Sequence, residues 1–379
     1  MTALTTAELA DLVRRVFRPR AEDRGLLIVL DLPDAAAPDT AAWAARRAMA
    51  RDWAARLDEA RGELGLLRVT LAHYRNARRP NQDLPATAAP FAGGAAPERA
   101  DDLAGKEVPF AELFAAHQIV LAPTEFSATA PLKLLAKRYG FRAATMPGFT
   151  PEMLPALRLD WTEIDARCRA LKARLDAADE ARFVFDSPLG RRALTLDLRR
   201  RAGHASGGLL AEPGVAGNLP SGESYIVPYE GEVAGDQSRS AGELPLEIDG
   251  EPVLFRIARN RVVEVVGDGP AADAERRELA AEPAYGNVAE LGLGILGEYG
   301  VKPCGELLLD EKLGLHVAFG RSDHFGGQIG AKDWNDPAKV IHLDRVFIPE
   351  VMPRVVVREV DLVAPDGAAA PLMRDGRYV

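Results

Sequence analysis

The spacing of apolar residues changes once along this chain, and the change limits what the chain can fold into. In the first part, continuous apolar stretches such as GLLIVLDLP (25–33) and LLRVTLAHY (66–74) alternate with segments of helical periodicity. After about residue 180, short segments follow one another in which apolar and polar residues alternate, among them ARFVFDS and EPVLFRIARNRVVEVV. The first pattern is typical of parallel strands covered by helices, and the second is typical of antiparallel strands with one polar face.

We therefore predict an α+β protein with two parts. A chain of 379 residues, 47% of them hydrophobic, is longer than one core usually serves. Residues 1–157 are expected to form an N-terminal α/β subdomain with a mostly parallel sheet, and residues 158–379 a C-terminal β-rich catalytic subdomain. A helix over about 160–180 is expected to link them. The Pro-, Ala- and Gly-rich stretch 75–107 is expected to be a long surface loop.

Composition excludes several classes of protein. The net charge of −9 argues against a nucleic-acid or anionic-membrane partner, for which a basic face is expected. Cys168 and Cys304 lie far apart without CxxC spacing, which excludes a disulfide framework and a cysteine zinc site. No apolar run approaches the ~18 residues that a membrane span needs. We expect a soluble, cytoplasmic protein with no membrane partner.

Histidines and aspartates gather late in the chain. His342 and Asp344 are two residues apart on a predicted strand, so their side chains share one face. His316 lies in another alternating strand, and Asp323 and His324 follow it in a glycine-bounded loop. A polar strand facing water, or a core histidine bonded to the backbone, explains each feature taken singly. Taken together, these residues near strand ends indicate a metal site.

Two glutamates could complete such a site. Glu223 follows a Pro-Ser-Gly turn in NLPSGESYIVP, and Glu290 lies among small and apolar residues in NVAELGLG. A buried carboxylate is costly unless it pairs or binds a metal, although an exposed strand-end charge explains either glutamate alone. A pair of divalent ions needs roughly five or six oxygen and nitrogen ligands, including a bridging carboxylate. That mixture is supplied by Glu223, Glu290, His316, His342 and Asp344.

Other catalytic motifs have no support in the sequence. GLGILG (292–297) matches the GxGxxG pattern, but it lies outside the β/α part and follows no convincing strand. No GxxxxGK[ST], GxSxG or HExxH occurs. The sequence therefore gives no basis for a phosphate-loop, serine-hydrolase or zincin function.

The ordered set of ligand motifs resembles that of the metal-dependent aminopeptidases typified by aminopeptidase T, the thermophilic or AmpS-type family. Glu223 ends NLPSGE, Glu290 opens a Glu-Leu-Gly segment and His316 ends DEKLGLH. His342 and Asp344 match the closing His-x-Asp, and the whole set spans roughly residues 140–350. The resemblance implies a homodimer with two divalent ions (Zn, Co or Mn) that cleaves an N-terminal residue from a peptide or small amide.

The resemblance also implies roles for these residues and one departure. All five would be metal ligands, with Glu290 or Glu223 bridging the ions. The family usually has a tyrosine seven residues after the histidine that matches His316, where this chain has Asp323. A carboxylate can act as a ligand or base, but it cannot donate a phenolic hydrogen bond. We expect Asp323, Glu223 or Glu290 to carry a proton to the leaving amine.

Two alternatives stay open. The ring-cleaving dihydroxypyridine dioxygenases are similar to this family in fold but hold one ferrous ion, with a histidine in the place of Glu290 and nothing that matches Glu223. Retention of both glutamates favours the two-metal hydrolase, while His316, His342 and Asp344 could form a 2-His-1-carboxylate Fe(II) site. The other alternative is a catalytically silent relative that keeps the fold as a binding or scaffold protein.

Overall fold

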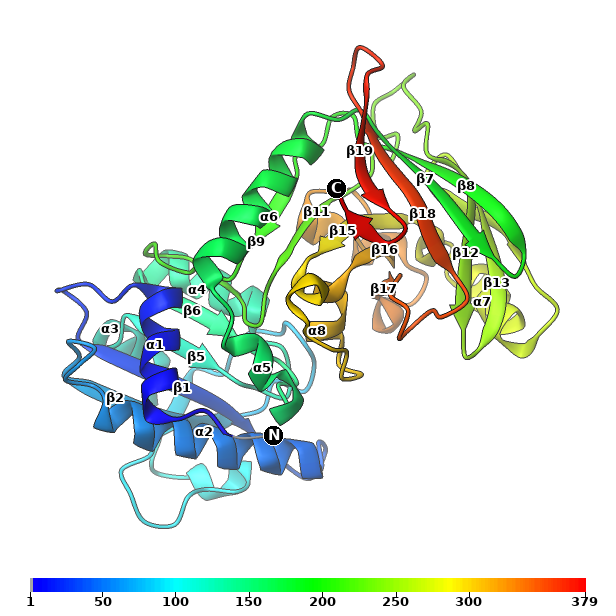
Figure 1. Ribbon diagram of the computed structural model, residues 1–379. Coiled ribbons are helices and arrows are strands. Elements are labelled where there is room, and N and C mark those ends of the chain that lie inside the picture. The colour runs from blue at the N-terminus through cyan, green and yellow to red at the C-terminus, as the bar shows by residue number, and fades with distance from the viewer. Residues whose placement is uncertain (1–2) are drawn as a thin grey trace. The chain divides into compact units, whose positions relative to one another are not determined.

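The computed structural model describes residues 3–379, which form an α+β fold as predicted (Figure 1). Contacts between residues divide it into two compact units. The first comprises the chain up to Asp165 together with Ser206–Ser221 and Cys304–Leu309. The second comprises Ala166–Ala205, Gly222–Pro303 and Asp310–Val379. None of the described helices is both long enough and apolar enough to cross a membrane.

The first unit is built on a seven-stranded sheet of order β10-β6-β5-β1-β2-β3-β4. Five neighbouring strands pair in parallel, and the two at one edge are antiparallel, so the prediction of a mostly parallel sheet is confirmed. The strands are β1 (Gly25–Leu32), β2 (Arg68–Arg75), β3 (Thr87–Pro90), β4 (Val108–Pro109), β5 (Ile119–Ala122), β6 (Arg142–Thr145) and β10 (Ala216–Asn218). The helices are α1 (Thr6–Phe17), α2 (Ala41–Glu59), α3 (Phe110–Ala116), α4 (Thr129–Tyr139) and α5 (Leu154–Leu157).

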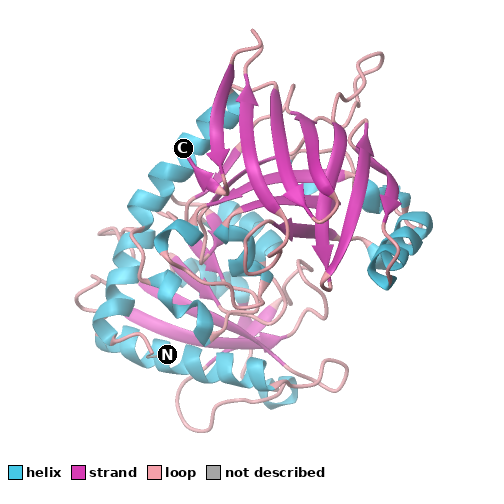
Figure 2. Cartoon of the chain, turned by 45° about the vertical axis from the view of Figure 1, so that its right-hand side comes forward, coloured by secondary structure: helices cyan, strands magenta, loops and turns pink. Residues whose placement is uncertain are grey.

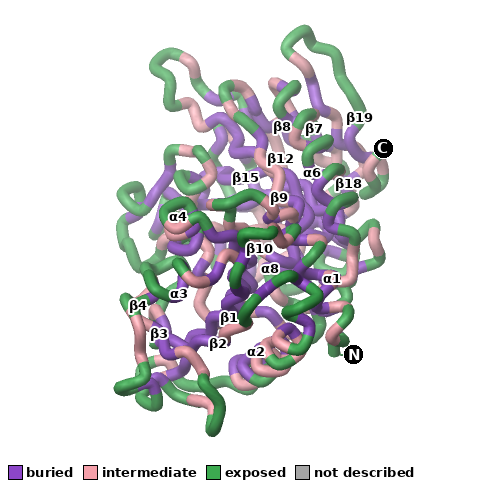
Figure 3. Tube along the Cα trace, turned by 90° about the vertical axis from the view of Figure 1, so that its left-hand side faces the viewer, coloured by how far each residue is buried: buried purple, intermediate pink, exposed green. Residues whose placement is uncertain are grey.

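Burial explains why the sequences of these strands are continuous apolar runs. All eight residues of β1 are buried, as expected of a parallel strand with helices on both faces. Figure 3 shows the trace near the β1 and β2 labels as mostly buried and the peripheral loops as exposed.

The prediction of a plain loop over 75–107 is wrong in part. The stretch contains β3 and a 3-10 helix (Ala100–Leu103), whose Leu103 is fully buried, but both are too short to show a period.

The second unit contains two sheets, which confirms the predicted β-rich part (Figure 2). The larger has the order β14-β13-β12-β8-β7-β18-β19-β20, and the smaller β17-β16-β15-β11-β9. The larger sheet consists of β7 (Glu180–Ser187), β8 (Gly190–Asp197), β12 (Ala241–Ile248), β13 (Glu251–Ala258), β14 (Arg261–Val266), β18 (Val356–Val363), β19 (Ala369–Arg374) and β20 (Arg377–Tyr378). The smaller consists of β9 (His204–Ser206), β11 (Glu223–Ile226), β15 (Val288–Gly294), β16 (Leu315–Gly320) and β17 (His342–Val346).

Two further helices lie close to their predicted positions, α6 (Trp161–Asp176) and α7 (Pro270–Ala281). The short α8 (Leu307–Asp310) was not predicted. The expectation that GLGILG follows no strand is wrong, because its first three residues end β15. Every residue of β15 is buried, so the strand shows no alternation of apolar and polar residues.

Candidate metal centre

The small sheet of the second unit brings the predicted ligands to one face. Glu290 on β15 lies opposite Ala318 on β16, which in turn lies opposite Asp344 on β17. Residues opposite one another on paired strands share a face, and so do residues two apart on one strand. His316 and His342 therefore join the same face. Figure 1 shows β15 and β16 side by side, as the pairing requires.

Glu223 enters from β11, the strand beside β15. Gly222, directly before it, has φ of 133°, a backbone conformation that side-chain-bearing residues rarely adopt. The carbonyl of Gly222 accepts a hydrogen bond from the Ile295 backbone at 2.9 Å. The turn thus ties the start of β11 to the end of β15, and Glu223 pairs in register with Gly294.

The five side chains form two groups that share Glu290. One group is Glu223, Glu290 and His316, the other is Glu290, His342 and Asp344, and the ligand atoms within each lie within 4.8 Å of one another. Glu290 Oε1 lies 3.3 Å from His316 Nε2, and Glu290 Oε2 lies 3.2 Å from His342 Nε2. Glu223 Oε2 lies 3.5 Å from His316 Nε2. Glu290 thus presents one oxygen to each group.

Backbone carbonyls orient both imidazoles. His316 Nδ1 lies 3.2 Å from the Gly314 carbonyl oxygen, and His342 Nδ1 lies 2.7 Å from that of Arg321. A proton on Nδ1 donates to each carbonyl, which turns Nε2 toward the carboxylates. Metal-binding histidines are commonly held in this way by a partner on the other ring nitrogen.

The donor set fits divalent metal ions. Asp344 Oδ1 is buried and has no hydrogen-bond partner among the described residues. Leaving a buried carboxylate oxygen without a partner is costly, whereas a cation at that position would satisfy it. Mixed imidazole nitrogen and carboxylate oxygen ligands suit zinc, manganese, cobalt and ferrous iron.

Protons balance the carboxylates of the metal-free site. Burial disfavours the charged form of His316, but Glu290, Asp344 and Glu223 outweigh it and raise its pKa to about 9. The pKa of His342 is also raised well above its ordinary value, because Asp344 and Glu290 outweigh burial. Hydrogen bonds with these two histidines, opposed by burial, hold the pKa of Glu290 below its usual range. Metal ions would displace those protons.

Lys312 is a part of the site that the sequence reasoning missed. It lies in the 3-10 helix Glu311–Leu313, and its side chain is 1% exposed. Its Nζ donates to Glu223 Oε1 at 2.7 Å and contacts Glu311 Oε1. Burial and the charges of Glu223 and Asp344 raise the pKa of Glu311 to about 8, with Lys312 opposing them. The available signal was the charged run DEK (310–312), which ends four residues before His316, but such runs usually lie in turns exposed to water.

Asp323 lies apart from the two ligand groups. It begins the 3-10 helix Asp323–Phe325, and its Oδ1 accepts a hydrogen bond from Arg321 Nε at 2.5 Å. Its side chain is 37% exposed. The structure therefore brings together five of the six predicted site residues and pairs the sixth with an arginine.

Aromatic rings lie beside the ligand groups. The Phe325 ring lies 5.2 Å from His342 and 4.9 Å from Tyr225, which stacks on His204 at 5.0 Å. His324 packs on Phe325 with ring centres 3.9 Å apart. Burial, His342 and Arg321 lower the pKa of His324 to about 4, so this ring is neutral near pH 7. Half-buried Phe325, Tyr225 and His204, with the exposed His324, form an aromatic surface next to His342.

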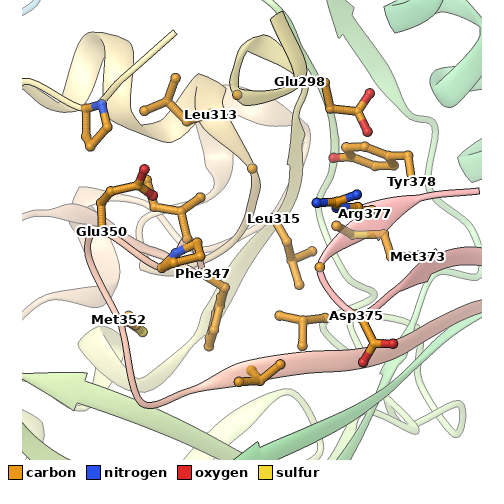
Figure 4. A pocket seen from close by; sticks show the side chains of 18 of the residues that line it. Glu298, Leu313, Leu315, Phe347, Glu350, Met352, Met373, Asp375, Arg377 and Tyr378 are labelled. Atoms are coloured by element: carbon orange, nitrogen blue, oxygen red, sulfur yellow. The ribbon is translucent and has the colours of Figure 1, made fainter. Parts of the chain in front are cut away.

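A cavity of about 920 Å³ lies elsewhere in the second unit and contains none of the five ligands. Its lining includes Leu315, Phe347, Glu298, Arg377 and Tyr378 (Figure 4). Leu315 precedes His316 on β16, and successive strand residues face opposite ways. The cavity and the ligand groups therefore use opposite faces of β16.

Comparison with known proteins finds a weak sequence match and two structures of similar fold. No protein-family model matches it. Aminopeptidase T from Thermus thermophilus is 28% identical over 192 residues, which are 46% of this chain and 42% of that protein. The chain thus matches less than half the length of this relative.

Two solved structures share the fold. The 2,5-dihydroxypyridine dioxygenase of Pseudomonas putida KT2440 has a TM-score of 0.62 at 15% identity, covering 99% of this chain and 98% of that one. AmpT from Thermus thermophilus has a TM-score of 0.56 at 18% identity, with the same coverage. The chain is accordingly a distant relative of aminopeptidase T, with the fold of both solved structures.

Proposed function

We propose that this protein is an aminopeptidase-like metallohydrolase with two divalent ions, zinc, cobalt or manganese, that releases an N-terminal residue from a peptide or small amide. The observation that carries the proposal is the position of Glu290. Its two oxygens lie 3.3 Å and 3.2 Å from the imidazoles of His316 and His342, one in each ligand group. The distant relationship to aminopeptidase T supports the same reaction class.

The site residues have separate tasks in this proposal. When bound, a pair of divalent ions supplies an activated water and polarises the scissile carbonyl. Glu290 offers one oxygen to each position, while His316 and His342 are held in place through Nδ1. Glu223 offers its Oε2, because its Oε1 is held by Lys312. Glu223 is the proposed carrier of a proton to the leaving amine, since Asp323 lies outside both ligand groups and is hydrogen-bonded to Arg321.

Metal content and hydrolysis test the proposal together. We expect about two divalent ions per chain by elemental analysis, and release of the amine from aminoacyl amides. Glu290→Gln should lower kcat/KM by about 100-fold or more, because a neutral amide cannot bridge two cations. Glu359→Gln, at a surface ion pair with Arg191, is the matched control and should leave the rate unchanged. A protein that binds no divalent ion, or a fully active Glu290→Gln variant, would contradict the proposal.

A second candidate is an Fe(II) ring-cleaving dioxygenase. The likeness to the dihydroxypyridine dioxygenase structure favours it, and His316, His342 and Asp344 would be the iron ligands. It predicts one iron per chain and oxygen uptake with an aromatic diol. Glu290 argues against it, because this carboxylate lies between the two imidazoles. A stoichiometry of two zinc ions would eliminate this candidate.

We propose a cytoplasmic homodimer without nucleic-acid or membrane partners as the working form. Sedimentation analysis of the purified protein tests the dimer. A silent relative of the family, which is the remaining alternative, would fold and assemble normally without binding metal or turning over substrate.

A further inference from the structure

Lys312 places a fixed positive charge inside one of the two ligand groups. Its ammonium lies 2.7 Å from Glu223 Oε1, and its side chain is 1% exposed. The other carboxylate that it contacts is Glu311, whose side chain is 16% exposed. A buried lysine requires such partners, since an unpaired buried charge is strongly disfavoured. Lys312 is therefore a structural cation in contact with a ligand of the centre.

This contact gives the two oxygens of Glu223 different partners. Oε1 is used by Lys312, while Oε2 lies 3.5 Å from His316 Nε2 and faces the ligand group. Glu223 can then offer only one oxygen to a metal ion. The group of Glu223, Glu290 and His316 is left with three ligand atoms from the protein, one from each residue.

The second group has no equivalent of Lys312. Among the described residues, neither Glu290 nor Asp344 forms an ion pair with a lysine or an arginine; their charged partners are histidines. Asp344 Oδ1 is buried without a hydrogen-bond partner. This group therefore keeps an unsatisfied oxygen for a metal ion, and no fixed cation opposes binding there.

We propose that Lys312 makes the two metal positions unequal: it competes for Glu223, so that the Glu290–His342–Asp344 position fills first and the Glu223–Glu290–His316 position fills second and more weakly. This inference rests on the proposed two-metal function. It implies that the activity of the enzyme depends on the metal concentration. At low metal concentration the protein holds one ion, and the active two-ion form appears only when the weaker position fills.

Whether removing Lys312 strengthens or weakens metal binding depends on the stability of the metal-free protein. Without the ammonium, Glu223 is a buried carboxylate that has lost its lysine partner, which destabilises the metal-free protein. A divalent ion at the second position relieves that cost and no longer meets a neighbouring positive charge. Removal of Lys312 should therefore tighten the weaker position and leave the tighter one nearly unchanged.

Metal titration by calorimetry tests this inference with zinc and manganese separately. The wild-type protein should show two dissociation constants that differ by about 10-fold or more. The double variant Glu311→Gln/Lys312→Met removes both charges of the buried pair, so it preserves net charge and protects folding. It should tighten the weaker position by at least about 10-fold. Lys312→Met alone should tighten it further and show a larger metal-induced rise in Tm.

Two further variants test whether the effect is specific to Lys312 and acts through Glu223. Lys302→Met removes a lysine from a surface ion pair with Glu350 and should leave both constants unchanged. In a Glu223→Gln background, Lys312→Met should have little further effect, because the lysine acts through Glu223.

Equal constants in the wild-type protein, or weaker second binding in both Lys312 variants, would overturn the inference and leave the two-metal function standing. Absence of any second ion in every variant would instead overturn the proposed function.

Discussion

At Gly292, the lack of a side chain is what allows His316 to reach the other ligands. A Cβ atom at this position would lie 1.8 Å from His316 Nε2, well inside van der Waals contact. Gly292 pairs with His316 across β15 and β16, so the two residues share the face on which the ligands gather. Gly292, the first glycine of GLGILG, thus leaves the space that the His316 ring occupies.

Gly292→Ala should displace the His316 ring and weaken metal binding. We expect the variant to lose at least one metal ion per chain and about 1–3 kcal/mol of stability through overpacking. Elemental analysis and thermal unfolding measure the two effects. Gly62→Ala is the matched control, since nothing lies within 4 Å of its added Cβ. Full metal content in Gly292→Ala would show that the ring has room to move.

Protons compete with metal ions at His316 and His342. In the metal-free protein the neighbouring carboxylates raise the pKa of His316 to about 9 and also raise the pKa of His342, so protons are held more tightly on both rings than on free imidazoles. Metal binding requires the neutral rings and must release these protons. Affinity should therefore rise as pH increases from 6 toward 9. Calorimetry in two buffers of different ionisation enthalpy measures the protons released, and a pH-independent affinity would contradict this expectation.

At the scale of elements, a ligand could be predicted where its strand could be recognised from the sequence. His316, His342 and Asp344 lie on strands that alternate, or that carry a His-x-Asp face, so their shared side could be predicted. β15 was not predicted, because Gly292 and Gly294 occupy two of its seven positions and glycine is uncommon in strands. Glu290 was found through its chemistry and motif instead.

Local sequence could not place the side chains that depend on tertiary contacts. Lys312 pairs with Glu223, a residue 89 positions earlier, and no short-range pattern indicates such a contact. Asp323 is a different case, because its partner Arg321 is only two residues away, and this local ion pair was overlooked when the position of Asp323 was considered. The strands β3 and β4 escaped prediction because they are only four and two residues long.

The segment Asp323–Phe325 gives the site an aromatic side. Phe325 lies 5.2 Å from the ring of His342, so an apolar group of a substrate bound at the ligands could pack on it. Phe325→Ala should lower kcat/KM for a phenylalanyl amide about 10-fold and for an alanyl amide much less, with metal content unchanged. Equal losses for both substrates would mean that the ring supports the site without selecting a side chain.

At the scale of the whole molecule, the two likenesses by fold do not distinguish one chemistry from another. The TM-scores of 0.62 for the dioxygenase and 0.56 for AmpT measure similarity of fold, and similarity of fold does not determine the reaction. The distinction depends on the donor atoms, and all five ligands come from the second unit. The first unit supplies none of them.

Metal removal should therefore affect the two units unequally. A metal ion present at 100 times its Kd stabilises the folded state by about 2.7 kcal/mol per site, so chelation should lower the Tm of the second unit. Hydrogen exchange followed by mass spectrometry should show faster exchange in β11, β15, β16 and β17 after chelation, with β1 and β2 unchanged. Uniform loss of protection in both units would contradict a role confined to the second.

The central claim is that Glu290 bridges two metal ions, and anomalous diffraction from crystals grown with zinc tests it most directly. We expect two anomalous peaks, each about 2.0–2.2 Å from a different oxygen of Glu290. One should also contact His316 and Glu223, and the other His342 and Asp344. A single peak bound by His316, His342 and Asp344, or no peak at these residues, would contradict the two-metal account.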